Sequence, residues 1–445
     1  MHVFMLGWEF PPFISGGLGT ACYGLTKALS RRHVQITFIL PKAIGTDYTS
    51  HVRLLSPQSR LAAVGDRSPE SVASTYMLNG SRDLANVTFK VVPSRVVSPY
   101  QSAGGRPHGI DSLGLRGERG RFPAMGDEPA GLDYGGDLQG ESQRFAALCI
   151  DLARGLDFDV IHAHDWMTFP AGLAVARMTG RPLIVHVHST EFDRSGDHVH
   201  QPVYDIERRG MHGAIRVIAV SYLTKSIAQY RYGVDPEKIE VIYNGIENGP
   251  GQAPLSRRAM ITRTDKIVLF LGRITMQKGP EYFVQAAKKV LEKIERVKFV
   301  MAGSGDMVRD VIQLAAEEGI GHKVLFTGFL RGRDVERVFR MADVYVMPSV
   351  SEPFGIAPLE AIRHDVPVII SKTSGVAEVL THALKVDFWD TEEIANKIIA
   401  VLRHPPLSTT LRQQADMEVR RLTWDDAAGK CENLYAETVD LMPVV

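Results

Sequence analysis

The chain of 445 residues contains 51 basic and 51 acidic side chains, and 44% of its residues are hydrophobic. A single hydrophobic core stops growing at roughly 250–300 residues, so this length predicts two domains of about 200 residues each. The balanced charge excludes a global field that would attract nucleic acid or an acidic membrane, so an anionic ligand must be bound by a local group of positive side chains.

The N-terminal apolar run begins without a basic segment, and Glu9 and the prolines after it interrupt the run early. It therefore predicts a buried strand rather than a signal peptide. No apolar stretch reaches the ~20 residues that are needed to span a bilayer. Three scattered cysteines suit a reducing compartment and fit neither a disulfide framework nor a metal-type spacing. Together these features predict a cytoplasmic protein without a transmembrane segment.

Short apolar runs alternate with helical patterns along almost the whole chain, which predicts parallel sheets with crossover helices. Near-continuous apolar runs indicate strands that are covered on both faces. In the first half we expect strands at Val3–Gly7, Gln35–Leu40, Thr88–Val92, Val160–His164, Leu183–His188, Val217–Val220 and Glu240–Tyr243. In the second half we expect strands at Ile267–Leu271, Lys298–Met301, Val324–Thr327, Val344–Met347, Val366–Ile370 and Leu384–Val386.

The segment Glu247–Asp265 lacks periodicity and contains Gly, Pro and charged residues, so it predicts a linker. We therefore expect two doubly wound, Rossmann-like α/β domains at 1–250 and 251–423, with a cleft between them. Ligands of such folds sit beyond the carboxyl ends of the strands. No element is evident in an insert at about 93–140, which predicts either a surface insert or a lid on the acceptor side.

Two positive side chains follow the expected strand at Ile267–Leu271. Arg273 and Lys278 lie on the turn into the next helix, beside glycines that allow close approach to the backbone. A guanidinium fork, an ammonium group and the positive end of a helix together suit a diphosphate. Taken alone, the turn is equally compatible with a solvated basic loop.

A second group follows the expected strand at Val344–Met347. Glu352 lies in the loop after this strand, and Glu360 lies about a turn and a half into the next helix. Carboxylates accept hydrogen bonds from sugar or ribose hydroxyls, and free N–H groups near Gly355 and Ile356 donate to oxygens. One glutamate alone would be an ordinary surface residue, but the pair predicts a site for a hydroxyl-rich ligand.

These two groups, together with the YNGI motif at 243–246, resemble the retaining GT-B glycosyltransferases, which include glycogen and starch synthases and sucrose-phosphate synthases. GWEFPP at 7–12, SGGLG at 15–19 and HAHDW at 162–166 are most similar to the glycogen/starch synthase branch. The resemblance covers nearly the whole chain except the insert. It departs at Ser15, where glycogen synthases usually carry a lysine. This change removes one phosphate contact and weighs against a polyglucan synthase, but not against glycosyl transfer.

The resemblance implies a donor site in the C-terminal half. Arg273 and Lys278 would neutralise the diphosphate and the charge that grows on the leaving group, and Glu360 would hold the ribose hydroxyls. The transferred sugar would be held by Glu352 and by the backbone amides of Phe354, Gly355 and Ile356.

The resemblance also implies site residues in the N-terminal half. His188 matches the family's histidine near the anomeric carbon, and Asp165 matches the acid near the sugar hydroxyls. The C-terminal helix, 424–445, would pack back on this domain, although an ordinary capping helix fits the sequence equally well. The remaining donor-binding residues would be Gly16, Gly17, Leu18 and Asn244.

The implied reaction transfers glucose from ADP-glucose or UDP-glucose to an α-glucan, with retention through front-face attack and without a metal or another cofactor. The leaving phosphate would take the acceptor proton, so neither glutamate needs to act as a nucleophile. One alternative is another GT-B α-glycosyltransferase with a small-molecule or lipid-linked acceptor. A second is a metal-dependent hydrolase that binds zinc through the His-x-His pairs at 162–164 and 186–188, although we expect His162 and His186 to be structural.

Overall fold

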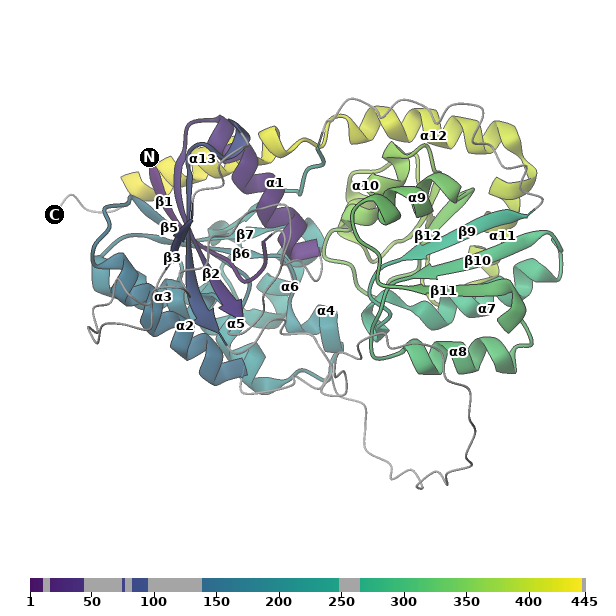
Figure 1. Ribbon diagram of the computed structural model, residues 1–445, viewed down its shortest axis with the longest axis horizontal. Coiled ribbons are helices and arrows are strands. Elements are labelled where there is room, and N and C mark those ends of the chain that lie inside the picture. Colours follow the sequence, from purple (N-terminus) through teal and green to yellow (C-terminus); the bar gives the residue numbers. More distant parts are fainter. Residues whose placement is uncertain (11–16, 44–73, 77–81, 95–137, 248–264, 442–445) are drawn as a thin grey trace, which may run out of the picture.

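The computed structural model describes residues 1–10, 17–43, 74–76, 82–94, 138–247 and 265–441 (Figure 1). The predicted linker, apart from its two end residues, lies outside these ranges, as do most of the insert, Ser15 and Gly16.

The described chain forms two sheets with helices on both faces (Figure 1). The first sheet has the order β3-β4-β2-β1-β5-β6-β7-β8, and all of its neighbours are parallel except β3 and β4. Its strands are β1 His2–Leu6, β2 Gln35–Ala43, β3 Ser74–Tyr76, β4 Val87–Ser94, β5 Val160–His164, β6 Leu183–Val187, β7 Arg216–Ala219 and β8 Ile239–Val241.

The second sheet has the order β11-β10-β9-β12-β13-β14 and is parallel throughout. Its strands are β9 Lys266–Leu271, β10 Val297–Ala302, β11 Val324–Gly328, β12 Val344–Met347, β13 Val368–Ser371 and β14 Leu384–Val386. The doubly wound architecture predicted from the alternating pattern is therefore confirmed.

Helices connect and cover these strands. In the first half they are α1 Gly17–Arg31, α2 Leu138–Ala153, α3 Phe169–Thr179, α4 Glu191–Ser195, α5 Gln201–Gly213 and α6 Tyr222–Tyr232. In the second half they are α7 Pro280–Leu291, α8 Val308–Glu317, α9 Arg333–Met341, α10 Ile356–Arg363, α11 Thr391–Arg403, α12 Pro405–Val419 and α13 Trp424–Asp440. Short 3-10 turns include η6 Met276–Lys278 and η8 Gly375–Glu378. Among the described helices, none is long and apolar enough to cross a bilayer.

The predicted strand boundaries need small corrections. The strand predicted at Val366–Ile370 is β13, which begins only at Val368, because Pro367 has no N–H to donate to a ladder. The antiparallel strand β3 was not predicted at all. The end of the predicted insert is helical, since α2 begins at Leu138.

Successive strand residues pack on opposite faces of the first sheet, as the alternation of strand side chains requires. Phe4 and Leu6 belong to the cluster under α2, α3 and α5, whereas Val3 and Met5 belong to the cluster under α1 and α13. All five residues of β5 are buried. The polar ends of these buried strands are therefore held in fixed positions at the edge of the sheet.

Helix α13 leaves the second domain after α12 and packs on α1 of the first domain (Figure 1). Arg31 Nη2 donates to Asp425 Oδ1 at 3.1 Å, and Tyr435 Oη lies 2.6 Å from His162 Nδ1. A Cβ atom on Gly24 would overlap the Trp424 ring, so α1 needs glycine at this point. The C-terminal helix thus ties the two domains together.

Candidate active site

The basic turn lies between β9 and α7. Lys278 ends η6, and Gly279 follows with φ 60° as the N-cap of α7. A Cβ atom on Gly279 would overlap the carbonyl oxygen of Pro348, and the Val350 N–H donates to the Gln277 carbonyl at 2.9 Å. The loop after β9 is therefore joined by its backbone to the loop after β12.

This junction brings two predicted site residues into contact. Lys278 Nζ forms an ion pair with Glu352 Oε2, and their side chains are only 19% and 10% exposed. Ser349 Oγ also donates to Glu352 Oε2, at 3.4 Å. Arg273 Nη2 donates to Gln277 Oε1 at 3.1 Å on the same turn. The ammonium and guanidinium groups are thus both held by polar contacts on the loop after β9.

The entry into α10 requires an unusual backbone. Gly355 has φ 104° and is the N-cap of the helix, and a Cβ atom there would lie 3.2 Å from Glu352 Cγ. Phe354 is buried, with its ring centroid 5.9 Å from that of Tyr243. This conformation places the first N–H groups of α10, from Ile356 onward, beside the Glu352 loop.

Glu360 lies a little more than one turn into α10. Burial raises the pKa of its carboxyl group to about 7. Burial also raises the pKa of the Tyr345 phenol, with further contributions from the Glu352 and Glu360 charges. Both carboxylates are therefore close enough to the Tyr345 phenol to disfavour its ionisation.

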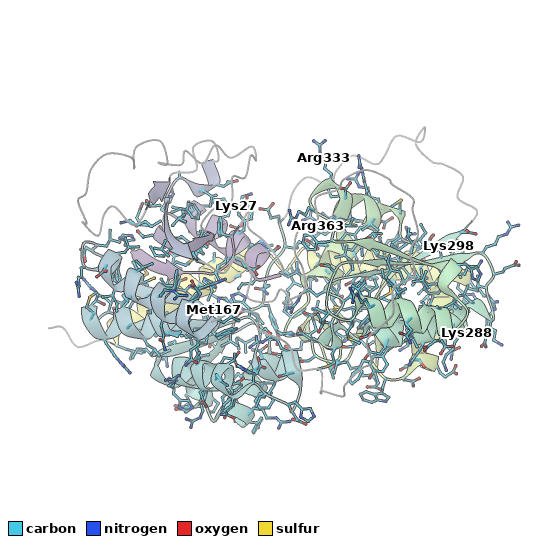
Figure 2. The ribbon with its side chains drawn as sticks, turned by 60° about the horizontal axis from the view of Figure 1, so that its bottom comes forward. Lys27, Met167, Lys288, Lys298, Arg333 and Arg363 are labelled. Atoms are coloured by element: carbon cyan, nitrogen blue, oxygen red, sulfur yellow. The ribbon has the colours of Figure 1, made fainter. Side chains whose placement is uncertain are left out.

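The first turn of α1 approaches α10 from the other domain. Gly17 begins α1, and Leu18 packs against the same apolar cluster as Ile356 of α10. Lys27 and Arg363, on these two helices, lie where the domains face each other (Figure 2). The first residue of α10, Ile356, therefore packs against an apolar cluster of the first domain that also contacts the first turn of α1.

Asp165 organises the loop that carries His188. It follows β5 with φ 59°, and its Oδ1 accepts hydrogen bonds from the N–H groups of His188 at 2.7 Å and Ser189 at 3.3 Å. Burial raises the pKa of its carboxyl group to about 7. Asn244 is buried in the loop after β8, where the neighbouring Gly245 lies against the backbone at the start of α13.

Four histidines form two hydrogen-bonded pairs beneath α1 and α13. His162 Nε2 lies 3.2 Å from His186 Nδ1, and His164 Nδ1 lies 2.9 Å from His188 Nε2. Burial lowers the pKa of His162 and His188 to about 3, and those of His164 and His186 also fall well below the usual range. The four rings are therefore neutral near pH 7.

Two sets of side chains in this cluster have potential metal-binding atoms within 4.8 Å of one another: Cys22, His164 and His188, and His162, His164 and His186. In each pair the facing ring nitrogens share a hydrogen bond, so the four rings form a hydrogen-bonded cluster in the core of the first domain.

Sequence and structure comparisons agree on one family. Residues 2–102 match the starch synthase catalytic domain model, residues 123–248 match Glycosyltransferase Family 4, and residues 254–417 match Glycosyl transferases group 1. An uncharacterized glycosyltransferase of Methanocaldococcus jannaschii is 34% identical over 99% of this chain and 100% of its own length. The chain belongs to the glycosyltransferases.

Other relatives of this glycosyltransferase are more distant. A glycogen synthase of Mycobacterium tuberculosis is 23% identical over 85% of this chain and 80% of its own. Anabaena HepE, solved with UDP and glucose, matches with a TM-score of 0.66 at 18% identity, over 98% of this chain and 100% of its own. A sucrose-phosphate synthase of Thermosynechococcus elongatus has a TM-score of 0.70 at 17% identity, over 98% of both chains. These structures confirm the GT-B fold.

The glycosyltransferase also contains a buried charged network that the sequence did not reveal. Arg194 Nε donates to Glu191 Oε2 at 3.1 Å and Nη1 donates to Ser189 Oγ at 3.2 Å, while Nη2 pairs with Glu207. This network supports the loop after His188. Glu191 and Arg194 are three residues apart on α4, but no local pattern marks their third partner, since Glu207 comes from the next helix, α5.

One cross-domain contact was also missed. Ser351 Oγ, in the Glu352 loop, donates to Asp193 Oδ1 in α4 at 2.6 Å. Asp193 completes a capping box with Thr190. The spacing of Thr190 and Asp193 predicts a helix start from the sequence alone. The contact of Asp193 with Ser351 in the other domain cannot be predicted in this way.

Proposed function

We propose that this glycosyltransferase is a retaining enzyme that moves a glucosyl unit from ADP-glucose or UDP-glucose to an α-glucan in the cytoplasm. The observation that supports this most strongly is the ion pair of Lys278 with Glu352, which joins the loop that carries Arg273 to the loop that enters α10. We take this junction, with its ammonium group, its carboxylate and the first N–H groups of α10, as the part of the site that meets the diphosphate and the sugar.

Each group has a distinct part in the proposed reaction. When a sugar leaves a nucleoside diphosphate, positive charge develops at the anomeric carbon and negative charge on the β-phosphate. Arg273 and Lys278 stabilise that phosphate, with the largest effect in the transition state, where its charge is greatest. Glu360 holds the ribose hydroxyls, and Glu352 with the amides of residues 354–356 holds the sugar. The leaving phosphate takes the acceptor proton, so the proposed reaction uses no metal.

A second acceptor class has support of its own. A D-inositol 3-phosphate glycosyltransferase 1 of Catenulispora acidiphila is 27% identical over 64% of this chain and 73% of its own length. Ser15 also lacks the positive charge of the glycogen synthase pattern. A small phosphorylated acceptor is therefore the alternative to an α-glucan. A metal-dependent hydrolase that used the His-x-His pairs would have no role for Arg273, Lys278 and Glu352.

A donor-by-acceptor screen tests the proposal. Release of nucleoside diphosphate is measured with ADP-glucose and UDP-glucose against glycogen, maltooligosaccharides and phosphorylated small sugars, each with and without chelator. We expect acceptor-dependent release with glycogen or maltooligosaccharides that chelator leaves intact and Arg273→Ala abolishes. Release only with a small acceptor would favour the alternative, and loss of activity with chelator would contradict the metal-free mechanism.

A further inference from the structure

The loop that carries Glu352 is held inside the second domain by its backbone. The Glu352 N–H donates to the Thr373 carbonyl at 3.0 Å, and the Glu352 carbonyl accepts from the Gly375 N–H at 2.9 Å. The residues on either side of Glu352, Ser351 and Pro353, form hydrogen bonds with the first domain as well. The same short loop is therefore bound to both domains.

Asp193 of α4 is the partner of Ser351. Ser351 Oγ donates to Asp193 Oδ1 at 2.6 Å, and Asp193 is only 2% exposed. The second oxygen, Asp193 Oδ2, accepts from the Thr190 N–H at 2.7 Å and from the Thr190 hydroxyl at 2.8 Å. All of these partners donate, which suits an ionised carboxylate, and hydrogen bonds to ionised acceptors are about twice as strong as neutral ones. The start of α4 thus orients Asp193 so that one oxygen faces the second domain.

Thr224 of α6 is the partner of Pro353. Thr224 Oγ1 donates to the Pro353 carbonyl oxygen at 3.4 Å in a buried contact. A Cβ atom on Gly375 would overlap both this carbonyl oxygen and Ser221 Cβ, so the two domains are in close contact here. Helix α4 lies at the side of the first domain that faces the second (Figure 1), against the η6 turn that carries Lys278, and α6 lies against η8.

These contacts bear on the direction of the Glu352 side chain. Because both chain neighbours of Glu352 are bound to the first domain, the backbone between them has little freedom to turn. The Glu352 side chain in turn pairs with Lys278 and accepts from Ser349. Positioning on this scale matters for group transfer, since a displacement of about 1 Å can lower a rate roughly 100-fold.

We propose that Asp193 and Thr224 are positioning residues, through which the first domain holds segment 351–353 and so aims Glu352 at the transferred sugar. Asp193 contributes more than Thr224, because its hydrogen bond is shorter and has a carboxylate as the acceptor. Both residues act through the neighbours of Glu352 and not on the sugar itself. The inference rests on the proposed function, because it takes Glu352 as the residue that holds the sugar.

The first test removes the donor to Asp193. Ser351→Ala deletes the hydroxyl group, whereas Ser351→Thr keeps it. We expect kcat to fall roughly ten- to a hundredfold in the Ala variant, and to stay within about threefold of the wild type in the Thr variant. The Kd for nucleoside diphosphate should stay unchanged, because Arg273 and Glu360 are untouched. Unchanged kcat in Ser351→Ala, or a loss that appears only in donor affinity, would contradict the proposal.

The second test identifies the partner of Ser351 by a double-mutant cycle. Ser351→Ala is combined with Asp193→Ala and, as a matched control, with Thr190→Ala. Both background variants break the capping box of α4, but only Asp193→Ala removes the acceptor of the Ser351 hydroxyl. We expect the added Ser351→Ala to lower kcat by less than about twofold in the Asp193→Ala background and by its full amount in the Thr190→Ala background. Equal costs in both backgrounds would overturn the role of Asp193, and melting curves of the set separate losses of folding from losses of kcat.

Thr224→Val tests the other side of the loop, since it deletes the donor to Pro353 at nearly constant volume. We expect kcat to fall by about two- to tenfold, less than in Ser351→Ala, because a peptide carbonyl is a neutral acceptor. A wild-type kcat in this variant would overturn the role of Thr224.

The third test needs no activity. Hydrogen exchange at the amides of Val350 and Glu352, which donate to carbonyls of the second domain, is compared in the wild type, Ser351→Ala and Ser351→Thr. We expect exchange at both amides to accelerate by about threefold or more in the Ala variant alone. Equal exchange in all three proteins would show that the first domain does not hold this loop. If the wild-type chain transfers no sugar from any donor, the proposed function fails, but exchange still decides whether Asp193 holds the loop, so the two failures are distinguishable.

Discussion

Lys278 and Glu352 are 74 positions apart in the sequence and form an ion pair in the free protein. Glu352 fixes the position of the ammonium group before the donor binds. A group that is held in place needs no reorganisation when charge develops on the leaving phosphate.

Lys278→Ala should therefore lower kcat more than it weakens donor binding. A charge-assisted contact contributes ~1.5–3 kcal/mol, so kcat/KM should fall at least ten- to a hundredfold, mainly through kcat. Lys278→Arg should rescue activity only in part, because a planar fork does not replace a compact charge. Lys289→Ala is the control, since Lys289 of α7 pairs with the exposed Glu392 of α11. Unchanged kcat with a raised donor KM in Lys278→Ala would show a simple binding contact.

Glu360 predicts a pH dependence of nucleotide binding. Its pKa is about 7, and ribose hydroxyls donate to the ionised form, so affinity should rise as the pH increases from 6 to 8. Henderson–Hasselbalch populations limit this gain to about tenfold. Calorimetric titration of nucleoside diphosphate into the wild type and Glu360→Gln measures it, and the phosphate's own titration cancels in the comparison. Parallel pH profiles for the two proteins would disprove the assignment.

The raised pKa of Glu360 also makes the free energy of unfolding depend on pH. The pKa of Glu360 is raised from 4.5 to about 7 in the folded protein, so the folded state favours the protonated carboxyl group. Its contribution to the free energy of unfolding is therefore complete below pH 4.5 and is lost as the pH rises towards 7. Glu360→Gln should remove this dependence.

At the scale of residues, the sequence predicted that Arg273, Lys278, Glu352 and Glu360 follow the carboxyl ends of two strands, because apolar runs mark both strands. The structure confirms these positions and brings Lys278 and Glu352 into contact. The Arg194 network could not be located in this way. Its partner Glu207 depends on how α5 packs beside α4, which no local spacing encodes.

At the scale of elements, the packing of α1 on α13 depends on small residues. A Cβ atom on Gly24 would overlap the Trp424 ring, whereas one on Gly429 of α13 would meet only the Arg32 side chain, at 3.5 Å. Substitutions at Gly24 and Gly429 can therefore be compared within one helix interface, because a Cβ atom has no room at the first position and has room at the second.

Gly24→Ala should lower the melting temperature, and Gly429→Ala should raise it slightly. Overpacking costs ~1–3 kcal/mol, which outweighs the gain of about 1 kcal/mol in helix propensity that both substitutions share. Thermal unfolding of the two variants beside the wild type measures the difference. Equal shifts would mean that α13 can move away from α1 without cost.

The elements that the sequence predicted best are the strands buried on both faces, such as β5 and β12, whose observed bounds equal the predicted ones. Prediction failed for β3, which has only three residues and pairs along one side with β4. So short a strand has no periodicity of its own to read.

At the scale of the whole molecule, the two domains are joined by Glu378 of η8. Its carboxylate accepts hydrogen bonds from the N–H groups of Tyr222 at 3.0 Å and Leu223 at 2.8 Å, in the first turn of α6. Tyr243 Oη donates to the same group at 2.9 Å. One domain thus caps a helix of the other across more than 150 positions of sequence.

Glu378→Ala should free these two amides. Charge-assisted hydrogen bonds contribute ~1.5–3 kcal/mol, so hydrogen exchange at residues 222 and 223 should accelerate roughly ten- to a hundredfold. Exchange in the rest of α6 should change little. Glu392→Ala, which breaks the exposed ion pair with Lys289, serves as the control. Unaltered exchange at 222 and 223 would mean that Glu378 does not hold the domains together in solution.

The central claim is that this glycosyltransferase transfers a sugar with retention, and the anomeric carbon of the product tests it most directly. UDP-glucose and ADP-glucose labelled with ¹³C at C1 are each mixed with the enzyme and a maltooligosaccharide, and the anomeric signals are followed by NMR from the first turnover. We expect the α-linked donor signal to convert to an α-glycosidic product signal, in step with the release of nucleoside diphosphate. A β-linked product, or free glucose without transfer to any acceptor, would contradict the account.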